Sequence, residues 1–137
     1  MKRRNLLQMA GVNALAALAA SGAAAKVGNA TFDAQKAKLT KENFGDLKIY
    51  FEGPTDQLKS MTAGSLRLKP GMSPHPPHKH PEEEIMLVTE GTGEILVDGK
   101  VNQVAPGAMM YCGGEQLHGI MNTGKTPLLF YFYKWQG

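Results

Sequence analysis

The chain has 137 residues, with 15 lysines and arginines against 12 aspartates and glutamates, which gives a formal net charge of +3. From Thr31 onward, however, eleven basic residues face twelve acidic residues, so the basic balance comes from the first segment. The charge is therefore no evidence for nucleic-acid binding, and no basic patch is interleaved with aromatic stacking residues. The single cysteine, Cys112, excludes an intrachain disulfide, so a small domain of this size needs a bound metal or a dimer interface as a further source of stability.

Residues 1–30 are predicted to be an export signal. A charged KRR start is followed by an Ala-rich, modestly apolar stretch, and small residues offer cleavage sites after Ala25 or after Ala30. Residues 3–8 (RRNLLQ) resemble a twin-arginine signal, and an ordinary Sec signal is the alternative. The stretch is too weakly hydrophobic to span a membrane. We therefore expect a periplasmic or secreted protein with no stable membrane insertion after cleavage.

Beyond this segment, short alternating stretches between turn signals predict strands and no helix. The predicted strands cover residues 47–51, 61–69, 85–89, 94–97, 100–104, 108–112, 117–121 and 128–135. Asp98-Gly99 is a strong signal for a two-residue hairpin. Four prolines between residues 74 and 81 exclude a central strand there and favour a rigid extended arm. The pattern predicts an all-β sandwich or barrel, with an N-terminal arm and first strand over residues 31–60 and the barrel over residues 61–137.

Three histidines and a glutamate have the pattern of a metal site. His78 and His80 are two residues apart, so on a strand both side chains would point to the same face. Glu84 follows four residues after His80, and His118 lies far downstream. Three neutral imidazoles and one carboxylate form a common ligand set for a divalent transition metal. The fold must therefore bring a local half-site and a distant histidine together.

The spacing of these residues resembles the two sequence motifs of the cupins. Residues 78–91 read His-x-His-x3-Glu-x6-Gly, and residues 107–122 have the spacing of the second motif. The departures lie in turns: Gly113-Gly114-Glu115 replaces the usual Pro-x-Gly, and Gly71 stands one residue further from the first histidine. The resemblance covers roughly Thr62 to Trp135. It implies one double-stranded β-helix (jelly-roll) barrel that holds a metal on His78, His80, Glu84 and His118.

Several neighbouring residues have more than one interpretation. His75 is predicted to be an exposed loop histidine, with a fifth ligand or a proton shuttle as alternatives. Cys112 is expected to be a small buried apolar residue, although it could face the pocket. Met86 should share the inward face with Glu84, where it packs in the core or, as an alternative, offers a soft copper ligand. Glu82 and Glu83 are expected to be solvated, and Asn122 to be structural.

The outward direction predicted for Arg67 bears on the substrate. Arg67 is the only arginine after the leader, and alternation places it opposite Leu66 and Leu68. A pocket without an inward arginine is a poor site for phosphorylated or dicarboxylic molecules. Neutral or phenolic molecules fit better, and two open metal positions would accept an enediol or an α-hydroxy acid.

Fold and metal do not choose a reaction. One hypothesis is an exported metal-dependent enzyme, dioxygenase-like or isomerase-like, and the other is a non-catalytic module that binds metal or a small ligand. Whether the protein is an enzyme stays open, and no catalytic residue or organic cofactor is assigned. Candidate acid or base groups are His75, Glu94, Tyr111 and Cys112. Manganese or iron is the favoured metal, with zinc, nickel or copper as alternatives. The aromatic residues 130–133 are expected to face the core on one side and a homodimer interface or solvent on the other.

Overall fold

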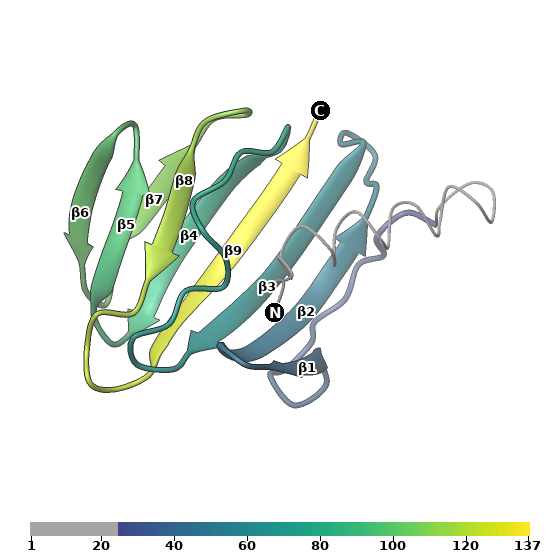
Figure 1. Cartoon of the computed structure of the whole chain (residues 1–137). Coiled ribbons are helices and arrows are strands. Elements are labelled where there is room, and N and C mark those ends of the chain that lie inside the picture. Colours follow the sequence, from purple (N-terminus) through teal and green to yellow (C-terminus); the bar gives the residue numbers. More distant parts are fainter. Residues whose placement is uncertain (1–24) are drawn as a thin grey trace.

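The computed structural model describes residues 25–137, which form nine β-strands (Figure 1). The predicted export signal lies for the most part outside the described residues. Within them no helix is present that could cross a membrane. The strands are β1 (Lys38–Glu42), β2 (Gly45–Gly53), β3 (Ser60–Leu68), β4 (Glu83–Glu90), β5 (Gly93–Val97), β6 (Lys100–Val104), β7 (Met109–Cys112), β8 (His118–Met121) and β9 (Leu128–Gln136). The all-β prediction is confirmed.

The strands form two antiparallel sheets that face each other. The larger sheet has the order β1-β2-β3-β9-β4-β7, and the smaller sheet has the order β6-β5-β8. In Figure 1 the smaller sheet lies in front of β4 and β7, and the chain between β3 and β4 crosses the inner side of the larger sheet. This crossing segment, residues 69–82, is called the proline arm below. It carries three of the four histidines.

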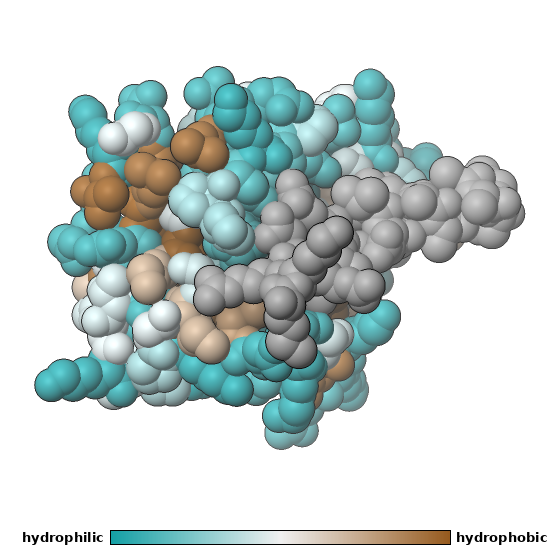
Figure 2. Space-filling model, viewed as in Figure 1, coloured by the Kyte–Doolittle hydropathy of each residue, from teal (hydrophilic) through white to brown (hydrophobic). Residues whose placement is uncertain are grey.

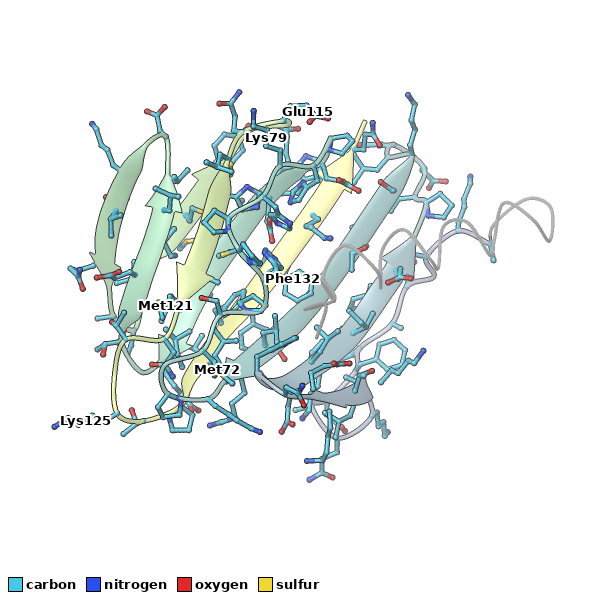
Figure 3. The ribbon with its side chains drawn as sticks, in the orientation of Figure 1. Met72, Lys79, Glu115, Met121, Lys125 and Phe132 are labelled. Carbon is cyan, nitrogen blue, oxygen red and sulfur yellow. The ribbon has the colours of Figure 1, made fainter. Side chains whose placement is uncertain are left out.

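Alternation along the central strands builds the core. On β3, Leu66 and Leu68 are fully buried while Arg67 is exposed, as predicted. On β9, Phe130 and Phe132 point inward, and Figure 3 shows Phe132 inside the barrel. Met86 on β4 is buried beside them, which confirms its inward direction. These side chains belong to one hydrophobic core cluster.

The turns and the motif asparagine behave as the sequence indicates. Asp98 and Gly99 both have positive φ, 52° and 70°, which is the conformation of the predicted two-residue hairpin turn. The Asn122 amide nitrogen donates to the carbonyl oxygens of Leu68 and Thr126 at 3.0 and 2.9 Å. Asn122 is therefore structural, because it ties the end of β8 to the end of β3.

The predicted first strand, residues 47–51, is the longer β2, and an additional strand, β1, pairs with it. β1 pairs with β2 along its whole length, although the sequence indicates only an arm in this region. The reason is that KLTKE forms an exposed edge strand, so no apolar alternation marks it. In Figure 2 brown atoms gather over the smaller sheet, where Val101 on β6 and Met121 on β8 are exposed.

Candidate metal centre

Strands and the proline arm each supply half of the site. Glu84 lies on β4 and His118 opens β8, so ladder hydrogen bonds fix both. The arm reaches β8 through one isolated bridge, in which the backbone of His78 exchanges two hydrogen bonds with that of His118, at 2.9 and 3.0 Å. The backbone N–H of Glu115 donates to the His80 carbonyl at 2.7 Å. Figure 3 shows Lys79 and Glu115 at the rim, where the arm meets the β7–β8 turn.

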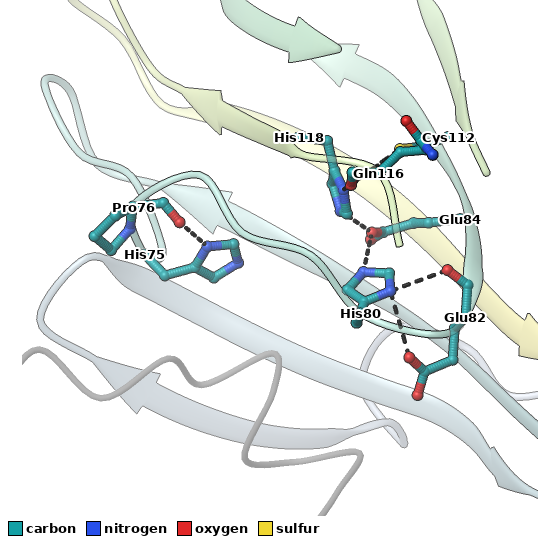
Figure 4. Close-up of polar contacts among 8 residues, drawn as sticks. All are labelled: His75, Pro76, His80, Glu82, Glu84, Cys112, Gln116 and His118. Carbon is teal, nitrogen blue, oxygen red and sulfur yellow. Dashed lines mark hydrogen bonds and ion pairs between the residues drawn. The ribbon is translucent and has the colours of Figure 1, made fainter. Parts of the chain in front are cut away.

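The structure brings Glu84, His80 and His118 into contact inside the barrel (Figure 4). Glu84 Oε2 lies 2.7 Å from His118 Nε2 and 3.0 Å from His80 Nε2. Ligand atoms of His78, His80 and His118 all lie within 4.8 Å of one another, and all three side chains are buried. These three histidines could hold a metal ion. His78 and His80 converge from an irregular segment rather than from one strand.

Backbone carbonyls orient two of the rings. His118 Nδ1 donates to the Gln116 carbonyl at 2.9 Å, and His80 Nδ1 donates to the Glu82 carbonyl at 3.0 Å. The Glu82 carboxylate also lies 3.3 Å from His80 Nδ1. The prediction that Glu82 is merely solvated is therefore wrong. Both contacts turn Nε2 towards Glu84, which is how ligand histidines are commonly held.

Cys112 is buried, as predicted, but it also touches the site. Its Sγ lies 3.4 Å from His118 Nδ1 and 3.6 Å from the Gln116 carbonyl. Burial raises the pKa of the thiol, so Cys112 stays neutral. It packs against the side of His118 that faces away from Glu84.

Hydrogen bonds and burial set the charges of the ligand residues. Burial opposes a charged His80, but its hydrogen bonds to Glu82 and Glu84 outweigh that effect and raise its pKa to about 9. Burial likewise disfavours a charged Glu84, yet hydrogen bonds from His118 and His80 lower its pKa to about 2. Burial and the neighbouring histidines lower the pKa of His78 to about 3. A cation would therefore meet an ionised Glu84 and a neutral His78, and would have to displace a proton from His80.

Unpartnered polar atoms in the site fit a bound cation. Among the described residues of the proposed centre, His78 Nδ1 and Glu84 Oε1 are buried and have no hydrogen-bond partner. Buried polar atoms without a partner are uncommon in folded proteins and call for an explanation. Imidazole nitrogens and a carboxylate oxygen suit a divalent transition metal. The donor set and the unpartnered atoms are consistent with a metal at this position.

The structure corrects three candidate acid or base residues. His75 is buried, not exposed, and it stacks on His78 with ring centroids 3.7 Å apart. Glu94 pairs with Gln103 on an exposed surface of the smaller sheet, and Tyr111 is exposed and donates to Glu83. Of the four candidates, His75 and Cys112 are at the site, while Glu94 and Tyr111 are outside it.

A buried lysine beside the site was missed by the sequence analysis. Lys134 lies on the inner face of β9, directly opposite Glu84 on β4 and Thr62 on β3. The same register continues from Glu84 to Cys112 on β7. Thr62, Lys134, Glu84 and Cys112 therefore form one row across the larger sheet. The signal was present, because Lys134 follows Phe130 and Phe132 in the same alternation.

Comparison with known proteins places the chain in a family. The sequence model of the family described as "Cupin domain" matches residues 64–133, a span that includes all four predicted ligand residues. The chain belongs to the cupin family. No curated protein matches the chain.

Solved cupin structures have the same fold. An RmlC-like cupin from Shewanella frigidimarina is 14% identical with a TM-score of 0.68, and the match covers 82% of this chain and 96% of that chain. KdgF from Halomonas sp. is 18% identical with a TM-score of 0.66, covering 80% and 96%. A predicted oxalate decarboxylase from Thermotoga maritima is 20% identical with a TM-score of 0.64, covering 79% and 100%. The predicted double-stranded β-helix barrel is thereby confirmed, while identities this low say nothing about the reaction.

Proposed function

We propose that this cupin holds one divalent transition-metal ion on His78, His80 and His118, with Glu84 as the fourth ligand. The observation that supports the proposal most is the convergence of three buried imidazoles, two of which contact one buried carboxylate oxygen of Glu84, at 2.7 Å for His118 and 3.0 Å for His80. Glu84 Oε1 is buried without a partner in the same place. Burying an ionised carboxylate is unfavourable unless a partner compensates it, and a cation is such a partner.

Each residue of the site has a role that follows from its contacts. Glu84 supplies the negative charge, and the carbonyls of Glu82 and Gln116 hold His80 and His118 with Nε2 turned inward. The walls of the barrel keep bulk water away, since the ligand side chains are buried. A divalent ion bound here would supply a Lewis acid with coordination positions left for a small molecule.

We further propose that the small molecule is neutral or phenolic and binds through oxygen. Arg67 supports this proposal, because it lies on the outer face and pairs with Glu90 at 3.0 Å. No arginine therefore reaches the site from the described residues. Lys134 is buried on the inner face of β9 opposite Glu84, so the inner wall is polar there, which suits a molecule that binds through oxygen. If the protein is an enzyme, we propose a dioxygenase-like or isomerase-like reaction on this molecule. The alternative is a module that binds the molecule without turnover.

Metal analysis of purified protein tests the centre. We expect about one metal per chain in the wild type and none in Glu84→Gln, because the amide provides neither the charge nor the strong donor. Glu83→Gln is the matched control, since Glu83 is the adjacent glutamate and contacts Tyr111 instead. Equal metal content in the two variants would remove Glu84 from the ligand set. A screen of phenols and α-hydroxy acids, with oxygen consumption as readout, then separates enzyme from binding module.

We propose manganese or iron as the metal and export of the folded protein through the twin-arginine route. Folding before export would let a weakly bound metal be trapped, whereas a site filled outside would favour copper or zinc by intrinsic affinity. Replacement of Arg3 and Arg4 by lysine should block export.

Cleavage after Ala25 is favoured over cleavage after Ala30. The Val27 N–H donates to the Pro54 carbonyl at 2.8 Å, and only cleavage after Ala25 keeps this hydrogen bond in the mature protein.

We also propose that a second copy of the chain covers the outer face of β9, β4 and β7. Apolar and aromatic side chains lie side by side there: Ile85 pairs with Tyr111 and Tyr133, and Leu87 pairs with Met109 and Tyr131. Met109 and Tyr111 are well exposed. The neighbouring charges Arg67 and Glu90 pair within the chain, so two such faces meet without net repulsion. Light scattering should show a homodimer that Met109→Asp disrupts; a wild-type monomer at micromolar concentration would contradict this.

A further inference from the structure

His75 is held against the proposed metal centre without belonging to it. Its side chain is only 3% exposed, and its ring stacks on His78 with centroids 3.7 Å apart and planes 30° apart. The group of histidines whose ligand atoms converge contains His78, His80 and His118, and His75 is outside it. In Figure 4 the ring extends from Pro76 towards His80 and Glu84. The free edge of His75 therefore faces the space beside the ligand residues.

The hydrogen bond to Pro76 determines which nitrogen of His75 is free. His75 Nδ1 lies 2.8 Å from the Pro76 carbonyl oxygen. A carbonyl oxygen only accepts, so Nδ1 carries the proton, and Nε2 of the neutral ring presents a bare lone pair. This Nε2 atom is buried, and no donor among the described residues reaches it. Buried acceptors are nearly always satisfied, so we expect the donor to come from a group other than the described residues.

We propose that His75 Nε2 accepts a hydrogen bond from a hydroxyl group of the molecule bound at the metal centre. This inference rests on the metal centre proposed above and narrows its ligand class. His75 selects molecules that keep a free O–H, such as α-hydroxy acids, enediols and phenols, over the corresponding O-alkyl ethers. An ether can still offer oxygen to a cation, but it has no proton for Nε2 and leaves this acceptor unsatisfied.

The test compares two probes on protein loaded with manganese. Glycolate carries a carboxylate and a hydroxyl group, and methoxyacetate is the same molecule with the hydroxyl proton replaced by methyl. Affinities of both are measured by calorimetry for the wild type and for His75→Phe. Phenylalanine keeps a ring to stack on His78 and removes the acceptor. Manganese content is measured in both proteins, so loss of the metal is distinguished from loss of the hydrogen bond.

We expect glycolate to bind the wild type more tightly than methoxyacetate, and this preference to fall about three- to tenfold in His75→Phe, the size of one hydrogen bond. Methoxyacetate affinity should change little. A preference that is the same in both proteins overturns the role of His75, even with manganese fully bound; that result is expected if an ordered water is the donor. Absence of manganese from the wild type instead overturns the metal centre itself.

If His75→Phe does not fold, His75→Asn takes its place in the test. The asparagine amide can still donate to the Pro76 carbonyl, but it does not reach the position of Nε2. Nitrogen NMR of the His75 ring in the loaded wild type provides a second readout. We expect a protonated Nδ1, and an Nε2 resonance that shifts on addition of glycolate and not of methoxyacetate. A proton found on Nε2 overturns the proposal.

Discussion

The two halves of the proposed metal site differ in how the backbone holds them. Glu84 and His118 lie on strands, where β4 is paired on both sides with β9 and β7 and β8 is paired with β5. His78 and His80 lie on the proline arm, where the backbone contacts near them are one isolated bridge to β8 and the hydrogen bond from Glu115. The start of the arm is held separately, because Gly71 and Met72 exchange hydrogen bonds with the Asn122 backbone. The arm therefore depends on proline stiffness and on a few contacts. The difference suggests that the strands define the site and the arm completes it.

Removal of one ligand from each half should separate these roles. His118→Ala and His80→Ala should both abolish stoichiometric metal, because each removes one of the converging imidazoles. In chelator-treated protein, His118→Ala should lower stability by roughly 2–4 kcal/mol, since it empties a buried strand position. His80→Ala should lower it by about 1–2 kcal/mol, since it mainly removes hydrogen bonds. Urea unfolding measures both, and equal losses would mean that the arm is as integral to the fold as β8.

A change in the turn under the arm should affect the metal more than the fold. A side chain at Gly114 would place its Cβ 2.5 Å from the Pro81 carbonyl oxygen, a backbone atom next to His80. At Gly113 the nearest atom is Gln116 Cγ, at 3.8 Å, so there is room. Gly114→Ala should therefore displace the arm and lower metal affinity about 10- to 100-fold, within the range for disturbed supports of metal ligands.

The matched variant Gly113→Ala should keep nearly full affinity. A chelator competition titration gives both values. Similar affinities for the two variants would show that the contact between Pro81 and the β7–β8 turn does not position His80.

Part of this arrangement follows from the sequence, and the part that does not has a physical reason. Alternation predicted β3, β4 and β9, and the spacing of two histidines, a glutamate and a distant histidine predicted the ligand residues that converge. The burial of His75 could not be predicted, because it depends on how the arm folds onto His78 and not on local pattern. Glu82 was missed for a similar reason. The inward direction of Lys134 follows from the alternation along β9, although lysine is one of the residues least often buried.

The pH dependence of chelator-treated protein should show the coupling between arm and strands. The pKa of His80 is raised from 6.5 to about 9, so its contribution to stability is present below pH 6.5 and is lost as the pH rises through 9. The pKa of His78 is lowered from 6.5 to about 3, so its contribution is present above pH 6.5 and is lost as the pH falls towards 3. The two effects place maximum stability near pH 6.5, with the melting temperature several degrees lower on either side.

The alkaline limb tests which residue is responsible. His80→Gln should flatten the decline above pH 6.5 and leave the acid limb in place, because His78 is unchanged. Melting curves of wild type and variant at matched ionic strength provide the comparison. A decline above neutral pH that persists unchanged in His80→Gln would assign it to another group and would contradict the proposed His80–Glu84 coupling.

The smallest effect is expected at Cys112, the strand residue behind His118. The Gln116 carbonyl already accepts the Nδ1 proton of His118 at 2.9 Å, while Cys112 Sγ is further away at 3.4 Å. Cys112→Ser keeps a hydroxyl in place of the thiol and should change metal affinity less than about threefold, because the hydrogen bond that orients His118 remains. Competition titration under reducing conditions measures this. A loss as large as that of His80→Ala would instead make the thiol a ligand, and the strand half of the site would then contribute three donors rather than two.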